Sequence, residues 1–291
     1  MNILTFDIEE WFVWDNLGFL TLEKRAEYDR RLGLILDLLD SRGVKATFFC
    51  VGMMGERFPD VIKKIAERGH EIGCHSDVHS WLNKMTEKEC REDTRSAIDR
   101  LEQCTGQKVI SYRAPAFSVG EGSEWIFNVL CENGITRDSS VFPAKRDFGG
   151  FASFGADTPS VIRCGGSTLH EFPIPVTKTV FGLTAFSGGG YFRFFPYRFV
   201  SSRMKGRDYN ICYFHLADFV KERKMTKSEY ETYFKEKASG LSLLARSVKT
   251  NLGKGRSWSK FDRLLSSFDF VSLAQADSII DWQGAPVALQ Q

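Results

Sequence analysis

The segment NILTFDIE, residues 2–9, decides the fold and supplies the first candidate site residues. Its short apolar run predicts a β-strand at the start of the chain. Side chains two positions apart on a strand share a face, so Asp7 and Glu9 point into one site at the end of this strand. The chain therefore opens with a strand that carries two carboxylates at its C-terminal end.

A histidine pair lies in the segment GCHSDVH, residues 73–79. His75 and His79 are suited to bind a divalent metal, because two imidazoles and one carboxylate hold such an ion and leave room for water. With Glu9 as the carboxylate, Asp7 is left over as a general base. A metal lowers the pKa of the water that it binds, and a general base takes the proton of this water during attack.

Two further segments carry charged residues where a predicted strand ends. In SYRAPAF, residues 111–117, Arg113 precedes a proline-stiffened turn and can hold a buried carboxylate such as Asp7 ionised and oriented. In RDSSVFP, residues 137–143, the acidic residue is Asp138. Taken alone, Arg113 is also compatible with an ordinary surface position.

The segment NICYFHL, residues 210–216, is an apolar strand that ends in His215. A histidine at this place suits either a buried structural role or a general acid. Its position favours the second role, because barrel active sites assemble at the C-terminal ends of strands. Five candidate residues share that position: Asp7, His75, Arg113, Asp138 and His215.

Apolar strands alternate with helical patterns along the chain, which predicts an α/β fold of parallel βα units. Strands are expected at residues 2–8, 46–51, 71–75, 109–112, 210–216 and 268–273, with a further strand that leads into Asp138. Helices are expected at residues 22–41, 59–69, 86–106, 123–132, 228–249 and 258–265. Between residues 144 and 195 the alternation weakens. No linker or repeat divides the chain, so one domain over residues 1–291 is expected.

The composition narrows the function classes. A formal net charge of +2 over 291 residues gives no reason to expect general nucleic-acid binding. No apolar run has the length of a transmembrane segment, and no signal peptide is expected before the first strand. The 7 cysteines form no CxxC pair and suit free thiols in a reducing compartment. These features predict a cytoplasmic location.

Five motifs, in order, resemble those of the polysaccharide deacetylase family, also called the NodB-homology or carbohydrate esterase family 4 domain. The motifs are TFDIE at residues 5–9, HSDVH at 75–79, RAP at 113–115, DSS at 138–140 and FH at 214–215. The resemblance extends from residue 1 to about residue 283. It implies a distorted (β/α) barrel of the NodB-homology type with seven parallel strands.

The chain departs from the usual family pattern at two places. Most members have two adjacent aspartates in the first motif, whereas this chain has DIE at residues 7–9. It therefore resembles the Asp-x-(Asp/Glu) branch, which includes peptidoglycan-deacetylase-like and exopolysaccharide-linked members. The adjacent Glu10 is the alternative to Glu9 as metal ligand. The fourth motif lacks the usual Asp-Trp pair, and Asp138 is the expected partner of His215.

The resemblance implies metal-dependent hydrolysis of the N-acetyl amide of an amino sugar, with release of acetate. The implied cofactor is zinc, or another transition metal such as cobalt or nickel. The implied catalytic residues are Asp7 as base, His215 as acid, Arg113 and Asp138, and the implied metal ligands are Glu9, His75 and His79. The implied substrate-binding residues are Ala116, through its backbone N–H, Phe117 and Tyr191. The aromatic run that Tyr191 opens suits either sugar stacking or an ordinary core.

The expected substrate is an N-acetylated saccharide, and a glycan precursor such as a nucleotide-linked or lipid-linked saccharide is favoured over assembled wall polymer. The basic stretches at residues 221–227 and 246–260 suit a solvated helix face or a phosphate-bearing carrier. Two other functions stay open. A metal-free amidohydrolase of the same fold would act on a cyclic ureide, as some relatives of the family do. A carbohydrate-binding pseudoenzyme would keep the fold and use its aromatic loop for recognition. The sequence leaves the oligomeric state open.

Overall fold

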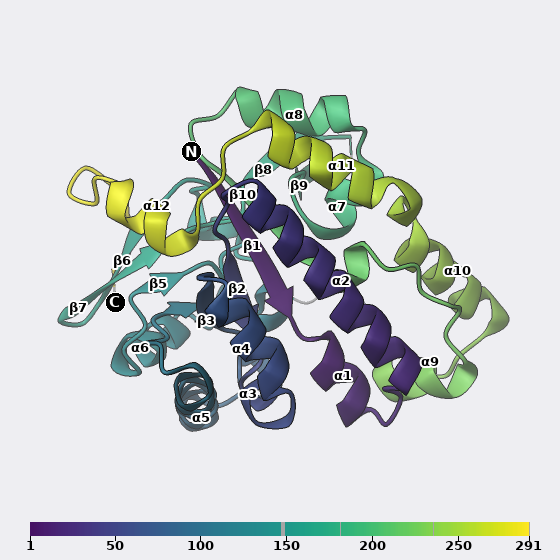
Figure 1. Ribbon diagram of the computed structural model, residues 1–291. Coiled ribbons are helices and arrows are strands. Elements are labelled where there is room, and N and C mark those ends of the chain that lie inside the picture. Colours follow the sequence, from purple (N-terminus) through teal and green to yellow (C-terminus); the bar gives the residue numbers. More distant parts are fainter. Residues whose placement is uncertain (147–148, 181, 235, 291) are drawn as a thin grey trace.

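The structure is a computed structural model that describes residues 1–146, 149–180, 182–234 and 236–290. Its main feature is one large sheet (Figure 1). In spatial order, the strands of this sheet are β10 (Asn210–His215), β1 (Asn2–Ile8), β2 (Thr47–Cys50), β3 (Glu71–Cys74), β4 (Ser111–Tyr112), β5 (Arg137–Asp138), β7 (Ser167–Glu171), β6 (Ser160–Cys164) and β11 (Val287–Gln290). From β10 to β7 every neighbouring pair is parallel. The predicted α/β fold with seven parallel strands is confirmed.

The strand β1 lies inside the sheet and fixes the place of the site. All its residues after Asn2 are buried, because β2 and β10 flank it on both sides. In this register Asp7 is beside His215 of β10 and beside Phe49 of β2. The parallel arrangement therefore gathers the C-terminal ends of these strands at one edge of the sheet.

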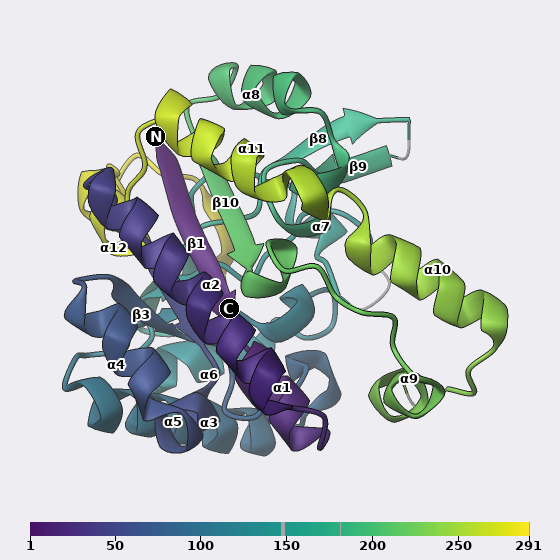
Figure 2. The ribbon, with the colours of Figure 1, turned by 45° about the vertical axis from the view of Figure 1, so that its right-hand side comes forward.

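Helices surround the sheet (Figures 1 and 2). They are α1 (Glu10–Asn16), α2 (Leu22–Ser41), α3 (Gly52–Arg57), α4 (Pro59–Glu67), α5 (Glu87–Thr105), α6 (Trp125–Glu132), α7 (Gly189–Phe194), α8 (Tyr197–Lys205), α9 (Lys227–Phe234), α10 (Gly240–Asn251), α11 (Lys254–Ser267) and α12 (Leu273–Ile279). The helix α5 shows how local sequence sets their ends. Thr86 and Glu89 form a capping box at its start, and Gly106 ends it with a φ of 70°.

The region with weakened alternation forms two antiparallel hairpins instead of further βα units. One hairpin is β6 with β7, and the other is β8 (Val176–Thr179) with β9 (Gly182–Ala185).

Among the described helices, none has both the length and the apolar character needed to cross a membrane.

Two predicted elements near the C-terminus are wrong. The single helix expected at residues 228–249 is two helices, because Ser239 accepts a hydrogen bond from the Ser242 N–H and starts α10 as a new helix. The strand expected at residues 268–273 is reduced to one bridge between Ile3 and Val271. It ends there because Ser272 caps the start of α12.

Candidate active site

The three predicted metal ligands meet at the C-terminal edge of the sheet. Glu9 follows β1, whereas His75 and His79 follow β3. The Glu9 Oε2 atom lies 2.6 Å from His79 Nε2 and 3.4 Å from His75 Nε2. The three potential donor atoms all lie within 4.8 Å of one another. The structure therefore brings together two imidazoles and one carboxylate, the donor set expected for a transition metal with open coordination positions.

Surrounding groups prepare these side chains to be ligands. The His75 Nδ1 atom lies 2.7 Å from the Arg113 carbonyl oxygen. A carbonyl can only accept, so Nδ1 carries the proton and the Nε2 lone pair is free for a metal. Burial raises the pKa of Glu9, but the charges of His79 and His215 and the close contacts with the rings of both ligand histidines outweigh burial and hold this pKa well below its ordinary value. The residues present thus fit a divalent cation.

The loop that carries His79 has an uncommon backbone conformation. Ser76 and His79 have positive φ angles of 64° and 57°, which cost about 1–3 kcal/mol each in residues other than glycine. Asp93 of α5 accepts hydrogen bonds from Ser76 Oγ at 3.2 Å and from the Asp77 N–H at 3.0 Å. The Ser76 Oγ in turn accepts one from the Ser80 N–H at 3.1 Å. Asp93, which sequence reasoning missed, therefore anchors the loop that presents a ligand.

Asp7 and Arg113 form a buried ion pair, as predicted. The Arg113 Nη1 atom donates to Asp7 Oδ1 at 2.8 Å, with side-chain exposures of 0% and 4%. Arg113 also donates to Thr5 Oγ1 at 2.8 Å and to Ser139 Oγ at 3.0 Å. Its guanidinium carbon lies 4.3 Å from the centre of the Phe49 ring. Arg113 is therefore held from several directions and fixes one oxygen of Asp7.

His215 faces both the base candidate and the metal ligands. Its Nε2 atom lies 3.7 Å from Asp7 Oδ2 and 3.8 Å from Glu9 Oε1. Its Nδ1 atom lies 3.6 Å from Asp218 Oδ2, and Arg193 Nε lies 2.8 Å from Asp218 Oδ1. Burial disfavours the charged ring, but the carboxylates of Glu9, Asp218 and Asp7 outweigh it and raise the pKa of His215 to about 10. The ring is therefore held as a proton donor.

The prediction that Asp138 partners His215 is wrong, because Asp218 holds that position. The buried carboxylate of Asp138 accepts from Ser140 Oγ at 2.6 Å and from the Ser140 N–H at 3.2 Å. It also lies beside the carboxyl of Glu171, and burial raises the pKa of both groups. The Ser140 Oγ accepts the N–H of Ala114 at 2.8 Å. Asp138 therefore supports the Arg113–Pro115 turn.

The three predicted substrate-binding residues lie in different environments. Ala116 has a φ of 54°, and its N–H has no hydrogen-bond acceptor among the described residues. The Phe117 side chain is 5% exposed and packs against Tyr213, with ring centres 5.2 Å apart, so it belongs to the core. Tyr191 is half-buried, and its ring centre lies 6.4 Å from that of Phe142. Contact of these residues with a substrate stays a prediction.

Glu10 is not part of the group of donors around the histidine pair. Its Oε1 atom accepts the Ala217 N–H at 2.7 Å. Burial, together with the neighbouring charge of Glu9, raises the pKa of Glu10 to about 7. The geometry therefore favours Glu9 over Glu10 as the third ligand.

Glu9→Gln should weaken metal binding by roughly 100-fold or more, because loss of groups that merely orient a ligand already costs about 10- to 100-fold. Glu10→Gln makes the same chemical change one residue away and should cost less than about tenfold. Competition with a chromophoric chelator measures both affinities. The reverse order would assign the ligand role to Glu10.

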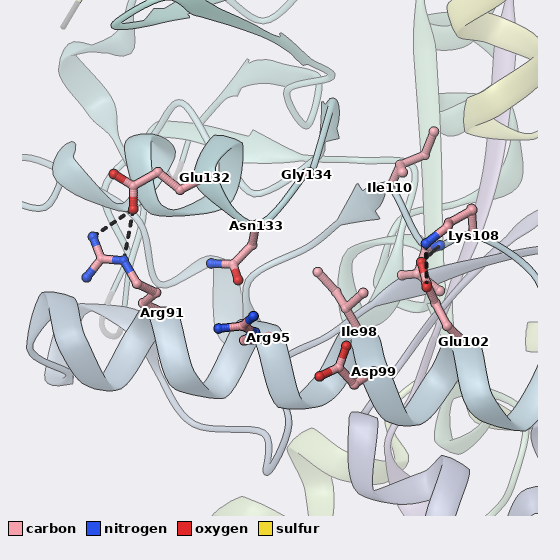
Figure 3. Close-up of a pocket in the computed structure, with 11 residues that line it drawn as sticks. Arg91, Arg95, Ile98, Asp99, Glu102, Lys108, Ile110, Glu132, Asn133 and Gly134 are labelled. Atoms are coloured by element: carbon pink, nitrogen blue, oxygen red, sulfur yellow. Dashed lines mark hydrogen bonds and ion pairs between the residues drawn. The ribbon is translucent and has the colours of Figure 1, made fainter.

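Two cavities differ in their relation to this site. The larger, about 440 Å³, lies between α5 and α6 at the loops that precede β4 and β5 (Figure 3). Its charged groups largely pair with one another, as Arg91 does with Glu132 at 2.7 Å and Lys108 with Glu102 at 2.8 Å. The smaller, about 180 Å³, includes Glu9 in its wall. Only the smaller cavity reaches the candidate metal ligands.

Comparisons with known proteins find matches over parts of the chain. Residues 11–135 match the family model of the polysaccharide deacetylases, and residues 139–277 match a domain of unknown function (DUF3473). The chain is 44% identical over 70 residues to a peptidoglycan-N-acetylglucosamine deacetylase of Bacillus cereus, which is 23% of this chain and 26% of the relative. It is 28% identical over 133 residues to a peptidoglycan deacetylase of Helicobacter pylori, which is 46% of this chain and 41% of the relative. The chain thus spans less than half the length of either relative.

Solved structures extend the likeness over the whole fold. A Mycobacterium smegmatis protein assigned to the polysaccharide deacetylases superposes with a TM-score of 0.67 over 98% of this chain and 91% of its own, at 17% identity. An allantoinase superposes with a TM-score of 0.57 over 93% of this chain and 85% of its own, at 14% identity. The solved structures thus share the fold of this chain, and the family-model match to the polysaccharide deacetylases covers residues 11–135.

Proposed function

We propose that this protein is a hydrolase that removes the N-acetyl group from an amino sugar in a saccharide and releases acetate and the free amine. The observation that carries this proposal is the position of Asp7, which is fixed by Arg113 at 2.8 Å and faces His215 at 3.7 Å. Both lie beside Glu9, the carboxylate of the candidate metal triad. A base, an acid and a metal triad in one site are what amide hydrolysis by water requires.

The side chains divide the reaction between them. Glu9, His75 and His79 would hold a divalent cation, with zinc as the first expectation, and the cation would supply Lewis-acid polarisation and lower the pKa of water. Asp7 accepts the proton of the attacking water. As the carbon–nitrogen bond breaks, His215 donates a proton to the departing nitrogen, which leaves as an amine. We assign stabilisation of the oxyanion to the Ala116 N–H, which has no acceptor among the described residues.

Two other functions are less well supported. The likeness to an allantoinase concerns the fold alone. A metal-free amidohydrolase does not need two imidazoles and a carboxylate around one point, and the structure has that set. A carbohydrate-binding pseudoenzyme does not need Asp7, which is buried and held by Arg113. The residues present therefore favour the deacetylase.

Acetate release from a panel of N-acetylated saccharides tests the proposed function. The panel should include chitin oligosaccharides, a peptidoglycan fragment and UDP-N-acetylglucosamine, because polymeric, nucleotide-linked and lipid-linked substrates all stay open. The protein should release acetate from at least one of them, and a chelator should abolish this activity. Hydrolysis of allantoin without acetate release would replace the proposal by the cyclic-ureide function.

His215→Ala should slow hydrolysis of an N-acetyl substrate about 10²- to 10⁴-fold, the usual contribution of a positioned acid. It should affect an activated aryl acetate ester far less, because that leaving group departs without a proton. The two rates are measured on the same enzyme preparation. Equal losses on amide and ester would remove His215 from the acid role and leave it as a positioning residue.

A further inference from the structure

The cavity beside Glu9 has one wall formed by residues outside the segment that matches the polysaccharide deacetylases. One side of the cavity is lined by residues of α1 and α2. The opposite wall is formed by residues between 222 and 254, a segment that includes α9 and α10. This wall lies within residues 139–277, the part of the chain that matches a domain of unknown function. Figures 1 and 2 show α9 and α10 projecting from the body of the molecule. The chain thus adds a wall on one side of its active site.

Most charged groups in this cavity neutralise one another. The Lys24 Nζ atom lies 3.8 Å from Glu222 Oε2, and Glu222 Oε1 accepts a hydrogen bond from the Tyr28 hydroxyl at 3.0 Å. Arg223 forms an ion pair with Glu229. These two pairs leave no net charge for a ligand.

Lys254 is the exception. Its side chain lines the cavity and is 6% exposed, and its Nζ atom has no hydrogen-bond partner in the described part of the chain. Burial lowers the pKa of Lys254 to about 8, even though Glu222 favours the charged form. A buried ammonium without an acceptor is costly unless a ligand supplies one. Lys254 therefore has the properties of a binding group.

The remaining lining favours a negatively charged saccharide. Arg246 also lines the cavity, and its Nε atom has no hydrogen-bond partner among the described residues, so Lys254 and Arg246 face the carboxylates of Glu9 and Glu10 across the same cavity. Trp14 and Tyr233 add aromatic surface, with ring centres 6.3 Å apart. Aromatic faces pack against apolar faces of ligands, while buried cations pair with anions. The cavity thus combines aromatic surface with two cationic side chains that each have a nitrogen without a hydrogen-bond partner among the described residues.

We propose that this cavity binds an anionic group of the substrate, with Lys254 as its main partner. The group is either the carboxylate of a sugar unit next to the reacting one or a phosphate linked to the sugar. This inference rests on the proposed function, because Glu9 places the cavity beside the reacting amide. Lys254 is then a specificity-determining residue.

Calorimetric titration of the full chain with three probes tests this inference. The probes are a hyaluronan tetrasaccharide, which carries carboxylates, N-acetylglucosamine 1-phosphate and neutral chitotetraose. The wild type should bind at least one anionic probe about 10- to 100-fold more tightly than the neutral one, the scale of one charged hydrogen bond. Lys254→Met should remove this preference and Lys254→Arg should retain it. Lys249→Met, a change at an exposed lysine of α10 outside the cavity, should leave it intact.

Each result has a distinct meaning. A preference for hyaluronan alone identifies a carboxylate as the ligand, and a preference for the phosphate alone identifies a phosphate-linked sugar. Equal affinity for charged and neutral probes, or a preference that survives in Lys254→Met, would overturn the inference. Binding is measured separately from acetate release. A protein that binds an anionic probe through Lys254 but releases no acetate from any substrate would refute the proposed function and not this site.

Discussion

His79→Ala and His75→Ala should each lose the bound divalent cation and the hydrolytic activity together. The three donor atoms lie within 4.8 Å of one another, so removal of either ring leaves only two protein ligands. We expect turnover to fall by roughly 10³-fold or more, the scale seen when one member of a group that acts as a unit is removed. Metal content after dialysis against zinc, and acetate release from the same samples, measure both effects.

His79→Ala is the cleaner of these two variants. The His79 side chain is 18% exposed, whereas that of His75 is 2% exposed and its removal also leaves the Arg113 carbonyl without its partner. His170→Ala is the matched control, because His170 pairs with Asp277 and is not part of the triad. It should retain metal and activity. Stoichiometric metal in both site variants would show that the ion is held elsewhere.

The site residues that lie at the C-terminal ends of strands were predictable from the sequence. Asp7 and His215 are recognisable in the sequence because each ends an apolar run, and parallel pairing in register places them side by side. His75 follows the same logic at the end of β3. Arg113 was predictable as a partner of Asp7, because a buried carboxylate that stays ionised needs a cation. Periodicity and strand order therefore specify the main chemical groups.

The acid's partner was not predictable by the same logic. Asp138 ends a strand, but its carboxylate accepts a hydrogen bond from Ser140 and lies beside the carboxyl of Glu171, so it does not pair with His215. Asp218 follows β10 in the turn after His215, and its Oδ2 accepts the backbone N–H of His215 at 2.9 Å and lies 3.6 Å from the ring Nδ1. The spacing of three residues between His215 and Asp218 was the available signal, since such pairs form local caps. A search for charged residues at strand ends does not find Asp218, because Asp218 lies three residues beyond the end of β10.

The wall of the cavity was also hidden from sequence patterns. Residues 228–249 have a helical pattern, but the cap at Ser239 divides them into α9 and α10. This division brings Tyr233 and Arg246, which lie on different helices, into one cavity with Lys254. Such a contact depends on how two short helices pack, which local propensity does not encode. The candidate anion site therefore became visible only in three dimensions.

Asp7→Asn should retain most of the metal but lower turnover by about two to four powers of ten, the usual effect of removing a positioned base. Asparagine keeps an oxygen that can accept the hydrogen bond from Arg113, which also retains its bonds to Thr5 and Ser139. The fold should therefore survive, and thermal unfolding checks this. Metal analysis and acetate release on one sample separate binding from chemistry. Turnover near the wild-type level would remove Asp7 from the base role.

Arg113→Ala should act on the same step, because the 2.8 Å ion pair is what fixes Asp7. If Arg113 contributes to turnover by positioning Asp7, its loss should matter little once the base is gone. The combined Asp7→Asn and Arg113→Ala variant should then lose less turnover than the product of the two separate losses. Independent, fully multiplicative losses would show that the Arg113 side chain affects the reaction by another route, such as its hydrogen bond to Ser139.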